Sequence, residues 1–119
     1  IGEVTFVSSY LKNPPIQFES DQEFINTCIK VSTRLSAFAL LNEIQEIERT
    51  MGRKRTKDAY ENRIIDIDII LLNDEVINNK KLTIPHSKYP SRSFVLIPMN
   101  EIGNYIDPRI FLTCKQLNQ

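Results

Sequence analysis

Arg63-Ile64-Ile65-Asp66-Ile67-Asp68-Ile69-Ile70-Leu71-Leu72 is the most apolar run of the chain, and it carries two acidic residues. Its many β-branched side chains favour an extended strand, in which successive side chains point to opposite faces. Asp66 and Asp68 would then project from one face, roughly 6–7 Å apart, and the opposite face would be entirely apolar. Because two neighbouring carboxylates repel and are costly to bury, a bound divalent cation would explain the pair. The alternative is that both acids face solvent on a one-sided sheet.

The composition is that of an ordinary globular domain. The 119 residues are 41% hydrophobic and 25% charged, and 15 basic side chains balance 15 acidic ones. A net charge of zero argues against a general nucleic-acid or membrane binder. Asp66 and Asp68 interrupt the longest apolar run, so no stretch has the length of a membrane span. Cys28 and Cys114 fit neither a zinc site nor a disulfide framework, and we expect reduced thiols and a cytoplasmic location.

Two further strands are expected before the acidic stretch. Val4–Leu11 is rich in β-branched and aromatic residues, and Asn13-Pro14-Pro15 would end it because proline lacks the amide donor that a ladder needs. In the second strand, Glu23–Thr33, Phe24 and Asn26 share one face. An aromatic ring beside an amide suits a flat heterocycle, although a half-exposed Phe and a surface Asn are the commoner explanation.

Helices are expected in the middle of the chain and towards its C-terminus. Ser36 can cap a helix that runs to about Met51, where Gly52 can end it in a left-handed conformation. A second helix is expected to begin near Arg92 with Ser91 as its cap, and a short terminal helix is expected from Arg109 to Leu117.

A basic segment joins the first helix to the acidic stretch. Five Lys and Arg side chains lie between Arg53 and Arg63 without an apolar period. Arginine binds phosphate oxygens bidentately, so this segment beside two carboxylates suits a polyphosphate–metal complex. A solvated run of charges is the alternative. His86, the only histidine, follows this region, and it would contact phosphate or serve a structural role.

Three motifs in sequence order resemble the 6-hydroxymethyl-7,8-dihydropterin pyrophosphokinase family of folate biosynthesis. They are Arg63-x-x-Asp66-x-Asp68-Ile69, Leu82-Thr83-Ile84-Pro85-His86 and Arg92-x-Phe94-Val95-Leu96-x-Pro98, and the register extends to Asn13-Pro14-Pro15, Phe24-Ile25-Asn26, Glu48 and Arg53-x-Arg55. Each motif is weak alone, but their order and spacing are specific. The resemblance covers essentially the whole chain. It implies transfer of the pyrophosphoryl group of ATP to the hydroxymethyl oxygen of the pterin, with release of AMP.

The resemblance also implies roles for individual residues. Asp66 and Asp68 would hold two Mg²⁺ ions that bridge the phosphates of ATP, the co-substrate, and Arg53 and Arg63 would be catalytic with them. Catalysis would consist of positioning and charge neutralisation. The pterin would be bound by Asn13, Pro14, Ile16, Phe24, Asn26, Glu48, Tyr60 and Phe94. The nucleotide would be bound by Leu41, Gln45, Arg55, Arg63, Ile69, Thr83, His86 and Arg92.

The implied fold is α+β, with a ferredoxin-like antiparallel sheet, helices packed on one face and the active site on the other. Residues 1–119 would form a single pterin pyrophosphokinase domain that is incomplete at the N-terminus. The family begins with a strand, a Gly-Ser-Asn-type turn and a helix, which this chain lacks. We expect the polypeptide to begin inside a longer one, or a partner segment to replace that strand. Tyr60 stands where the family usually has Trp, and Asn62 where it usually has Pro.

Two other functions compete with the enzyme. One is a nucleotide- or pterin-binding remnant without turnover, which the missing first strand favours. The other is a metal-dependent nuclease or another phosphotransferase that uses the same acidic pair. It is disfavoured because the chain has no further acidic cluster and no aromatic–basic surface. We therefore expect small-molecule substrates, no nucleic acid and no membrane, and we leave self-association or fusion to other folate-pathway enzymes open.

Overall fold

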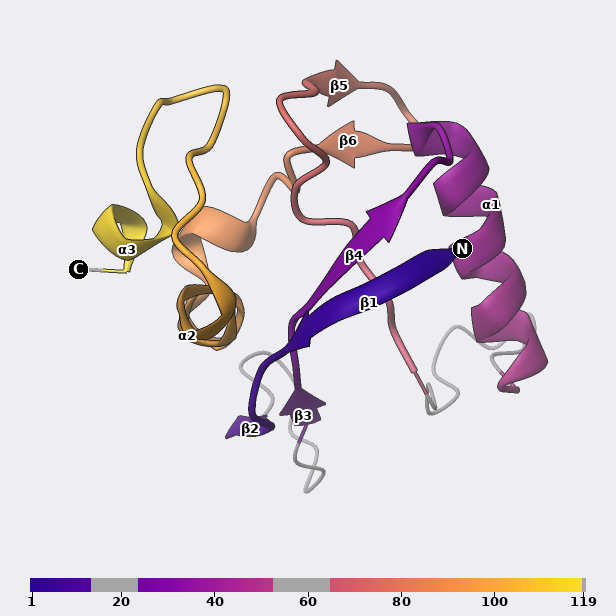
Figure 1. Ribbon diagram of the computed structural model, residues 1–119, viewed down its shortest axis with the longest axis horizontal. Coiled ribbons are helices and arrows are strands. Elements are labelled where there is room, and N and C mark those ends of the chain that lie inside the picture. The colour runs from indigo at the N-terminus through magenta and orange to yellow at the C-terminus, as the bar shows by residue number, and fades with distance from the viewer. Residues whose placement is uncertain (14–23, 53–64, 119) are drawn as a thin grey trace.

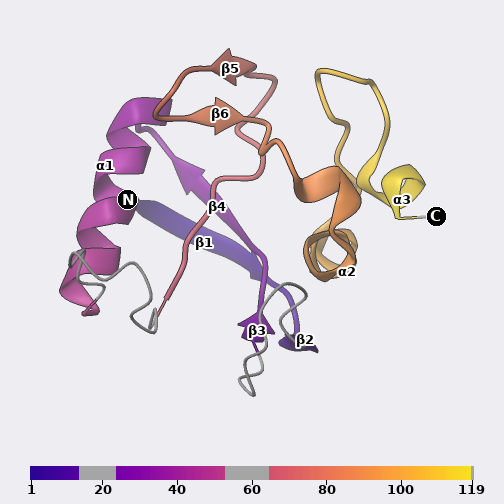
Figure 2. The same ribbon diagram turned by 180° about the vertical axis from the view of Figure 1, so that it is seen from behind.

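The chain folds into pairs of antiparallel strands and short helices. The computed structural model describes residues 1–13, 24–52 and 65–118. Figure 1 shows α1 on one flank of the β1–β4 pair and α2 and α3 on the other flank, and Figure 2 shows the same arrangement from behind. The elements are β1 (Gly2–Val7), β2 (Leu11–Asn13), β3 (Phe24–Asn26), β4 (Ile29–Thr33), α1 (Ala37–Thr50), β5 (Ile77–Asn78), β6 (Thr83–Ile84), the 3-10 helix η1 (Tyr89–Ser91), α2 (Ser93–Ile102) and α3 (Cys114–Leu117).

Both predicted N-terminal strands are interrupted, the first at residues 8–10 and the second at residues 27–28, which lie opposite each other. The described strands form three separate antiparallel pairs, β1–β4, β2–β3 and β5–β6. Between β3 and β4, the amide of Cys28 donates to the hydroxyl of Ser8 at 2.8 Å, so a side chain takes a place in the ladder. The amide of Ser9 is diverted to the carboxylate of Glu101 in α2, at 2.8 Å. The prediction of two unbroken strands was wrong because these side chains compete with the ladder.

The prediction of a strand across the acidic stretch is also wrong for its described part, residues 65–72. None of these residues belongs to a strand. The amide of Ile67 instead donates to the carboxylate of Glu48 at 3.0 Å, and the carbonyl of Ile70 accepts from the amide of His86 at 2.9 Å. The alternation of faces is nevertheless confirmed from residue 65 to residue 69. Asp66 and Asp68 are exposed, and the isoleucines between and beside them are half-buried.

Helix α1 agrees with its prediction because its signals are local. The hydroxyl of Ser36 accepts from the amide of Ala39, and Gly52 has a φ of 97°, the left-handed region that glycine tolerates. Helix α2 begins after Arg92, which is its N-cap. Ser91 is not the cap, because its hydroxyl donates to the carbonyl of Lys88 within η1.

The predicted terminal helix is much shorter than expected. Only α3 is helical, because Phe111 has a φ of 54°, which a right-handed helix cannot contain. Thr113 then starts α3 through a capping box with Gln116. Within the described ranges, none of the helices has the length and apolar character needed to cross a bilayer.

Two hydrophobic clusters hold the described elements together. One contains Tyr89, Leu96, Met99 and Cys114, and the other contains Ala37, Leu82 and Ile84. Residues 69–72 pack against both, since Ile70 and Leu71 contact the first cluster and Ile69 and Leu72 the second. The C-terminal half of the acidic stretch therefore links the clusters.

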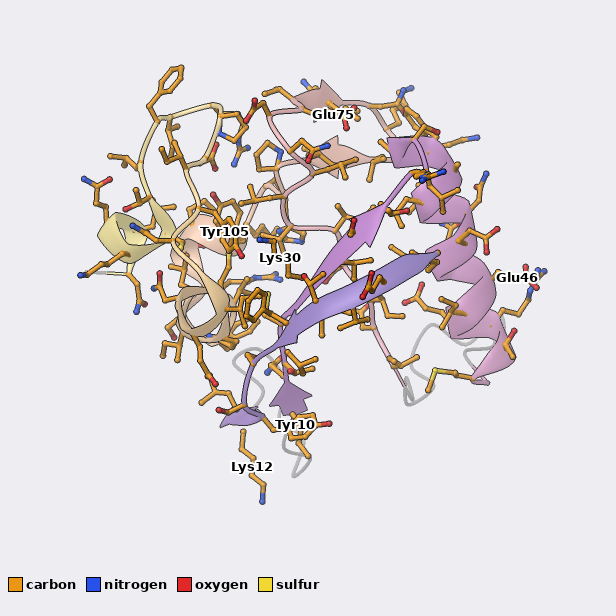
Figure 3. The ribbon with its side chains drawn as sticks, in the orientation of Figure 1. Tyr10, Lys12, Lys30, Glu46, Glu75 and Tyr105 are labelled. Carbon is orange, nitrogen blue, oxygen red and sulfur yellow. The ribbon has the colours of Figure 1, made fainter. Side chains whose placement is uncertain are left out.

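A lysine joins β4 to the C-terminal region. The ammonium of Lys30 lies 5.8 Å from the ring centroid of Phe6 in β1 and 5.4 Å from that of Tyr105, and Figure 3 shows Lys30 and Tyr105 side by side. Such cation–π contacts contribute about 0.5–1 kcal/mol at exposed sites. They supplement the apolar packing between these parts.

The two methionines give a matched test of the first cluster. Met99 is 3% exposed and Met51 is 46% exposed. We expect Met99→Ala to lower the free energy of unfolding by about 2–5 kcal/mol, because it leaves a cavity. Met51→Ala should change it by less than about 0.5 kcal/mol. Urea denaturation measures both values, and equal losses would contradict the assignment of the core.

Candidate functional site

A hollow beside the acidic stretch brings together residues that are far apart in the sequence. Its volume is about 240 Å³, and it lies between α1, residues 67–69 and the segment around β6. Four side chains predicted to contact the nucleotide line it, as does the predicted metal ligand Asp68. The lining residues are Leu41, Ile67, Asp68, Ile69, Lys81, Leu82, Thr83, His86 and Ser87.

Asp68 is the carboxylate of this site whose ionised form is least favoured by its surroundings. Although Asp68 is exposed to solvent, partial desolvation of its carboxyl group raises its pKa, and repulsion from the carboxylates of Asp66 and Glu48 raises it further. The charge of His86 when it is protonated and the charge of Arg92 act in the opposite direction, but the net shift is upward. The ionised carboxylate is therefore incompletely compensated by the protein, and a cation would relieve it.

His86 is held as a hydrogen-bond donor. Its Nδ1 accepts from the amide of Lys88 at 3.1 Å, so the neutral ring carries its proton on Nε2. Burial lowers the pKa of His86, and the positive charges of Arg92 and Lys88 lower it further, against the opposing effect of Asp68. At neutral pH the imidazole is thus uncharged and can donate from Nε2 to an anionic oxygen.

The acidic pair suits Mg²⁺ that arrives with a polyphosphate. Carboxylate oxygens are hard ligands, and Mg²⁺ is usually bound by one or two of them, with waters and substrate phosphates completing its shell. Among the residues that the structure describes, no three His, Cys, Asp or Glu side chains are grouped to hold a metal ion. Asp66 and Asp68 therefore fit a metal shared with a ligand better than a metal enclosed by protein alone.

Glu48, a predicted pterin contact, is buried against the acidic stretch. It is 7% exposed, and its Oε2 accepts from the amide of Ile67, one residue before Asp68. Its carboxylate also contributes to the field at Asp68. The described contact is therefore a brace between α1 and the acidic stretch.

Arg92 and Phe94 lie together at the start of α2. The guanidinium carbon of Arg92 is 5.5 Å from the centroid of the Phe94 ring. The charge of Arg92 acts on both Asp68 and His86, so this predicted nucleotide residue is near the hollow although it does not line it. Gln45 is exposed on α1.

Residues predicted for the pterin lie on the β2–β3 pair. Asn13 is paired with Phe24, and Asn26 is paired with Leu11. The described part of the acidic stretch begins near the C-terminal end of α1 and runs towards β5 and β6 (Figure 1). Six predicted site residues lie outside the described ranges, namely Pro14, Ile16, Arg53, Arg55, Tyr60 and Arg63.

Four residues that line the hollow were not among the predicted site residues, namely Ile67, Lys81, Leu82 and Ser87. Lys81 lies in a bend before β6, and both it and the adjacent Leu82 line the hollow, so strand alternation from Thr83 does not distinguish them. Ser87 directly follows His86, and no pattern in the sequence distinguishes it from other surface serines.

Comparison with known proteins gives a consistent match. A family model described as 7,8-dihydro-6-hydroxymethylpterin-pyrophosphokinase matches residues 1–104. A Haemophilus influenzae protein named 2-amino-4-hydroxy-6-hydroxymethyldihydropteridine pyrophosphokinase is 38% identical over 97 residues, which are 82% of this chain and 60% of the relative. A Bacillus subtilis protein of the same name is 36% identical over 104 residues, 87% of this chain and 62% of the relative. The chain thus spans about three fifths of these relatives.

A longer relative shows a different arrangement. A Dictyostelium discoideum protein named for folic acid synthesis is 38% identical over 109 residues, which are 89% of this chain but 16% of that protein. In that relative the matching region is a small part of a long polypeptide.

Replacing Glu48 should test its bracing role. We expect Glu48→Ala to lower the free energy of unfolding by about 1–3 kcal/mol, because the amide of Ile67 loses its acceptor. Glu48→Gln keeps an acceptor oxygen and should cost less. Glu46→Ala is the control, since Glu46 lies on the same helix (Figure 3) and pairs with the exposed Arg49, so the change should alter stability by less than about 0.5 kcal/mol. Urea denaturation at neutral pH distinguishes them, and equal losses at positions 46 and 48 would refute the brace.

The raised pKa of Asp68 predicts a pH-dependent cost. A carboxyl group whose pKa is raised on folding destabilises the folded chain once it is ionised, so the cost is present at neutral pH and disappears in acid. Without divalent cations, we expect Asp68→Asn to raise stability at pH 7 by roughly 0.5 kcal/mol, a small value because the group is partly exposed to solvent. The gain should vanish below the ordinary pKa of aspartate. Thermal unfolding in a chelator measures it against Asp74→Asn, and a gain that persists in acid would contradict the assignment.

Proposed function

Because the chain belongs to the 7,8-dihydro-6-hydroxymethylpterin pyrophosphokinase family, we propose that it transfers pyrophosphate from ATP to 6-hydroxymethyl-7,8-dihydropterin in folate biosynthesis. The products would be AMP and the pterin diphosphate. The observation that supports this most is the hollow in which Leu41, Ile69, Thr83 and His86 meet Asp68. Residues proposed for the nucleotide and for the metal share one cavity there.

In this proposal the nucleotide occupies the hollow. Leu41 and Ile69 offer apolar contact, Thr83 offers a hydroxyl group, and the Nε2–H of His86 donates to a phosphate oxygen. Arg92 adds positive charge near the same phosphates. Gln45 on α1, together with Arg55 and Arg63 outside the described residues, completes the proposed nucleotide set.

The chemistry requires alignment and charge compensation. The hydroxymethyl oxygen of the pterin would attack the β-phosphorus, lose its proton, and displace AMP as the bond from the β-phosphorus to the bridging oxygen breaks. Two Mg²⁺ ions held by Asp66 and Asp68 would supply positive charge to the phosphates. The protein holds the reactants in line, which is the main requirement of phosphoryl-type transfer. Arg53 and Arg63 would add charge at the reacting group.

The pterin would lie near the β2–β3 pair. Phe24 and Phe94 would stack on its two faces, and Asn26 would hydrogen-bond its ring. Glu48 would act indirectly, because it holds Ile67 next to Asp68. The other proposed contacts are Asn13, Pro14, Ile16 and Tyr60.

We also propose the wider setting. Residues 1–119 would belong to one pterin pyrophosphokinase domain, with a ferredoxin-like sheet, helices on one face and the active site on the other. Small molecules would be its substrates, the cytoplasm its location, and fusion to other folate-pathway enzymes, as suggested by the long Dictyostelium relative, or self-association would be compatible with it.

A second candidate function has its own support. The described strands form three separate pairs rather than one continuous sheet. A protein that binds nucleotide or pterin without turnover would agree with this observation.

The decisive assay is AMP release from Mg²⁺-ATP with and without the pterin. It is run on this chain and on a version extended at its N-terminus. We expect pterin-dependent AMP, and we expect Asp66→Ala to abolish it and to weaken Mg²⁺-ATP binding, because the metal loses a ligand. Asp74→Ala, at an exposed turn, is the control. Folded proteins that bind a substrate but release no pterin-dependent AMP would establish the binding function instead.

A further inference from the structure

A buried carboxylate lies beyond the region that matches the family. Asp107 is 1% exposed, and the family match ends at residue 104. Its Oδ2 accepts from the hydroxyl of Tyr89, which is also 1% exposed, and from Nη2 of Arg109 at 3.2 Å. Its Oδ1 accepts from the amide of Arg109 at 2.8 Å. Both oxygens of the carboxylate are therefore hydrogen-bonded.

The hydrogen bonds of this network determine which of its groups are ionised. Burial alone would raise the pKa of Asp107, but the hydrogen bonds from Arg109 and Tyr89 outweigh burial and lower it. Burial and the bond to Asp107 raise the pKa of the Tyr89 hydroxyl. The network thus joins a carboxylate, a guanidinium and a neutral phenol at neutral pH. Such charge-assisted bonds are directional, and a network of them selects one geometry.

Tyr89 belongs to the same turn as two residues of the candidate site. The amide of Lys88 donates to the His86 ring, and the carbonyl of Lys88 accepts from the amide of Ser91 at 3.2 Å. The amide of Arg92 donates to the carbonyl of Tyr89 at 3.1 Å. Residues 86–92 therefore form one hydrogen-bonded unit, in which His86 lines the hollow and Tyr89 is buried in the first cluster.

We propose that Tyr89, Asp107 and Arg109 form a positioning clasp that fixes the 86–92 turn and thereby orients His86 and Arg92 towards the phosphates of a bound nucleoside triphosphate. The identity of that ligand rests on the proposed function. The placement of His86 by the clasp does not.

Tyr105 provides a matched control for Tyr89. It packs against the same cluster, and its hydroxyl donates to the carbonyl of Ile102 at 3.1 Å. It lies outside the 86–92 turn, beside Lys30 (Figure 3). Tyr105→Phe therefore removes a tyrosine hydroxyl bond from the C-terminal region and leaves the clasp intact.

The first readout is the NMR signal of the His86 ring. His86 is the only histidine, so the protein gives one imidazole Cε1–H signal. At pH 8 the ring is neutral in every variant, and the signal reports its surroundings. We expect Tyr89→Phe and Asp107→Asn to shift this signal and Tyr105→Phe to leave it in place, although all three lose a buried or half-buried hydrogen bond.

The second readout is the dissociation constant of Mg²⁺-ATP. We expect it to rise about tenfold in Tyr89→Phe and Asp107→Asn, by analogy with the loss that follows removal of a residue that orients a metal-ligating side chain. The value for Tyr105→Phe should equal that of the unaltered chain. If the unaltered chain does not bind Mg²⁺-ATP, the proposed function fails, and the His86 signal still decides whether the clasp positions the ring.

One further variant keeps the test decisive. Arg109 has a side chain that is 29% exposed, so Arg109→Gln weakens the network without opening a core cavity. If the other two variants do not fold, this variant should still shift the His86 signal. An unchanged signal in the folded variants, or an equal shift in Tyr105→Phe, would overturn the proposal.

Discussion

The hydrogen bond from the amide of Ile67 to the carboxylate of Glu48 holds the acidic stretch against α1. It acts where the stretch changes from acidic to apolar, since Asp66 and Asp68 flank Ile67 and only apolar residues follow up to Leu72. Those apolar residues, 69–72, pack into both hydrophobic clusters. A backbone segment with no strand partner among the described residues is thereby kept in one place, and the hollow beside Asp68 depends on it.

The same anchoring concentrates charge. Packing of the apolar half leaves Asp68 exposed but partly desolvated, and its carboxylate is repelled by those of Asp66 and Glu48. Ionised Asp68 therefore destabilises the folded chain, which a better solvated carboxylate would not do. Strained charges of this kind are typical of sites that bind a counter-charge, and here a metal–polyphosphate complex would provide it.

The C-terminal region contributes to this site from a distance. Tyr89 projects from the turn that carries His86, and it meets a carboxylate from a loop that is 18 residues away in the sequence. The first cluster surrounds this contact, because Tyr89 packs with Leu96, Met99 and Cys114. Core packing and site geometry are thus coupled through one tyrosine side chain.

The sequence alone determined the features that depend on neighbouring residues. The ends of α1 follow from Ser36 and Gly52. The exposure of Asp66 and Asp68 between half-buried isoleucines follows from the two-residue period of an extended backbone. The order of the motifs also identified the family. Only the tertiary structure decided the pairing of the acidic stretch, the burial of Glu48 and the role of Asp107. Each of these depends on a hydrogen-bond partner contributed by a distant segment, and local propensity carries no information about which distant group will be nearest.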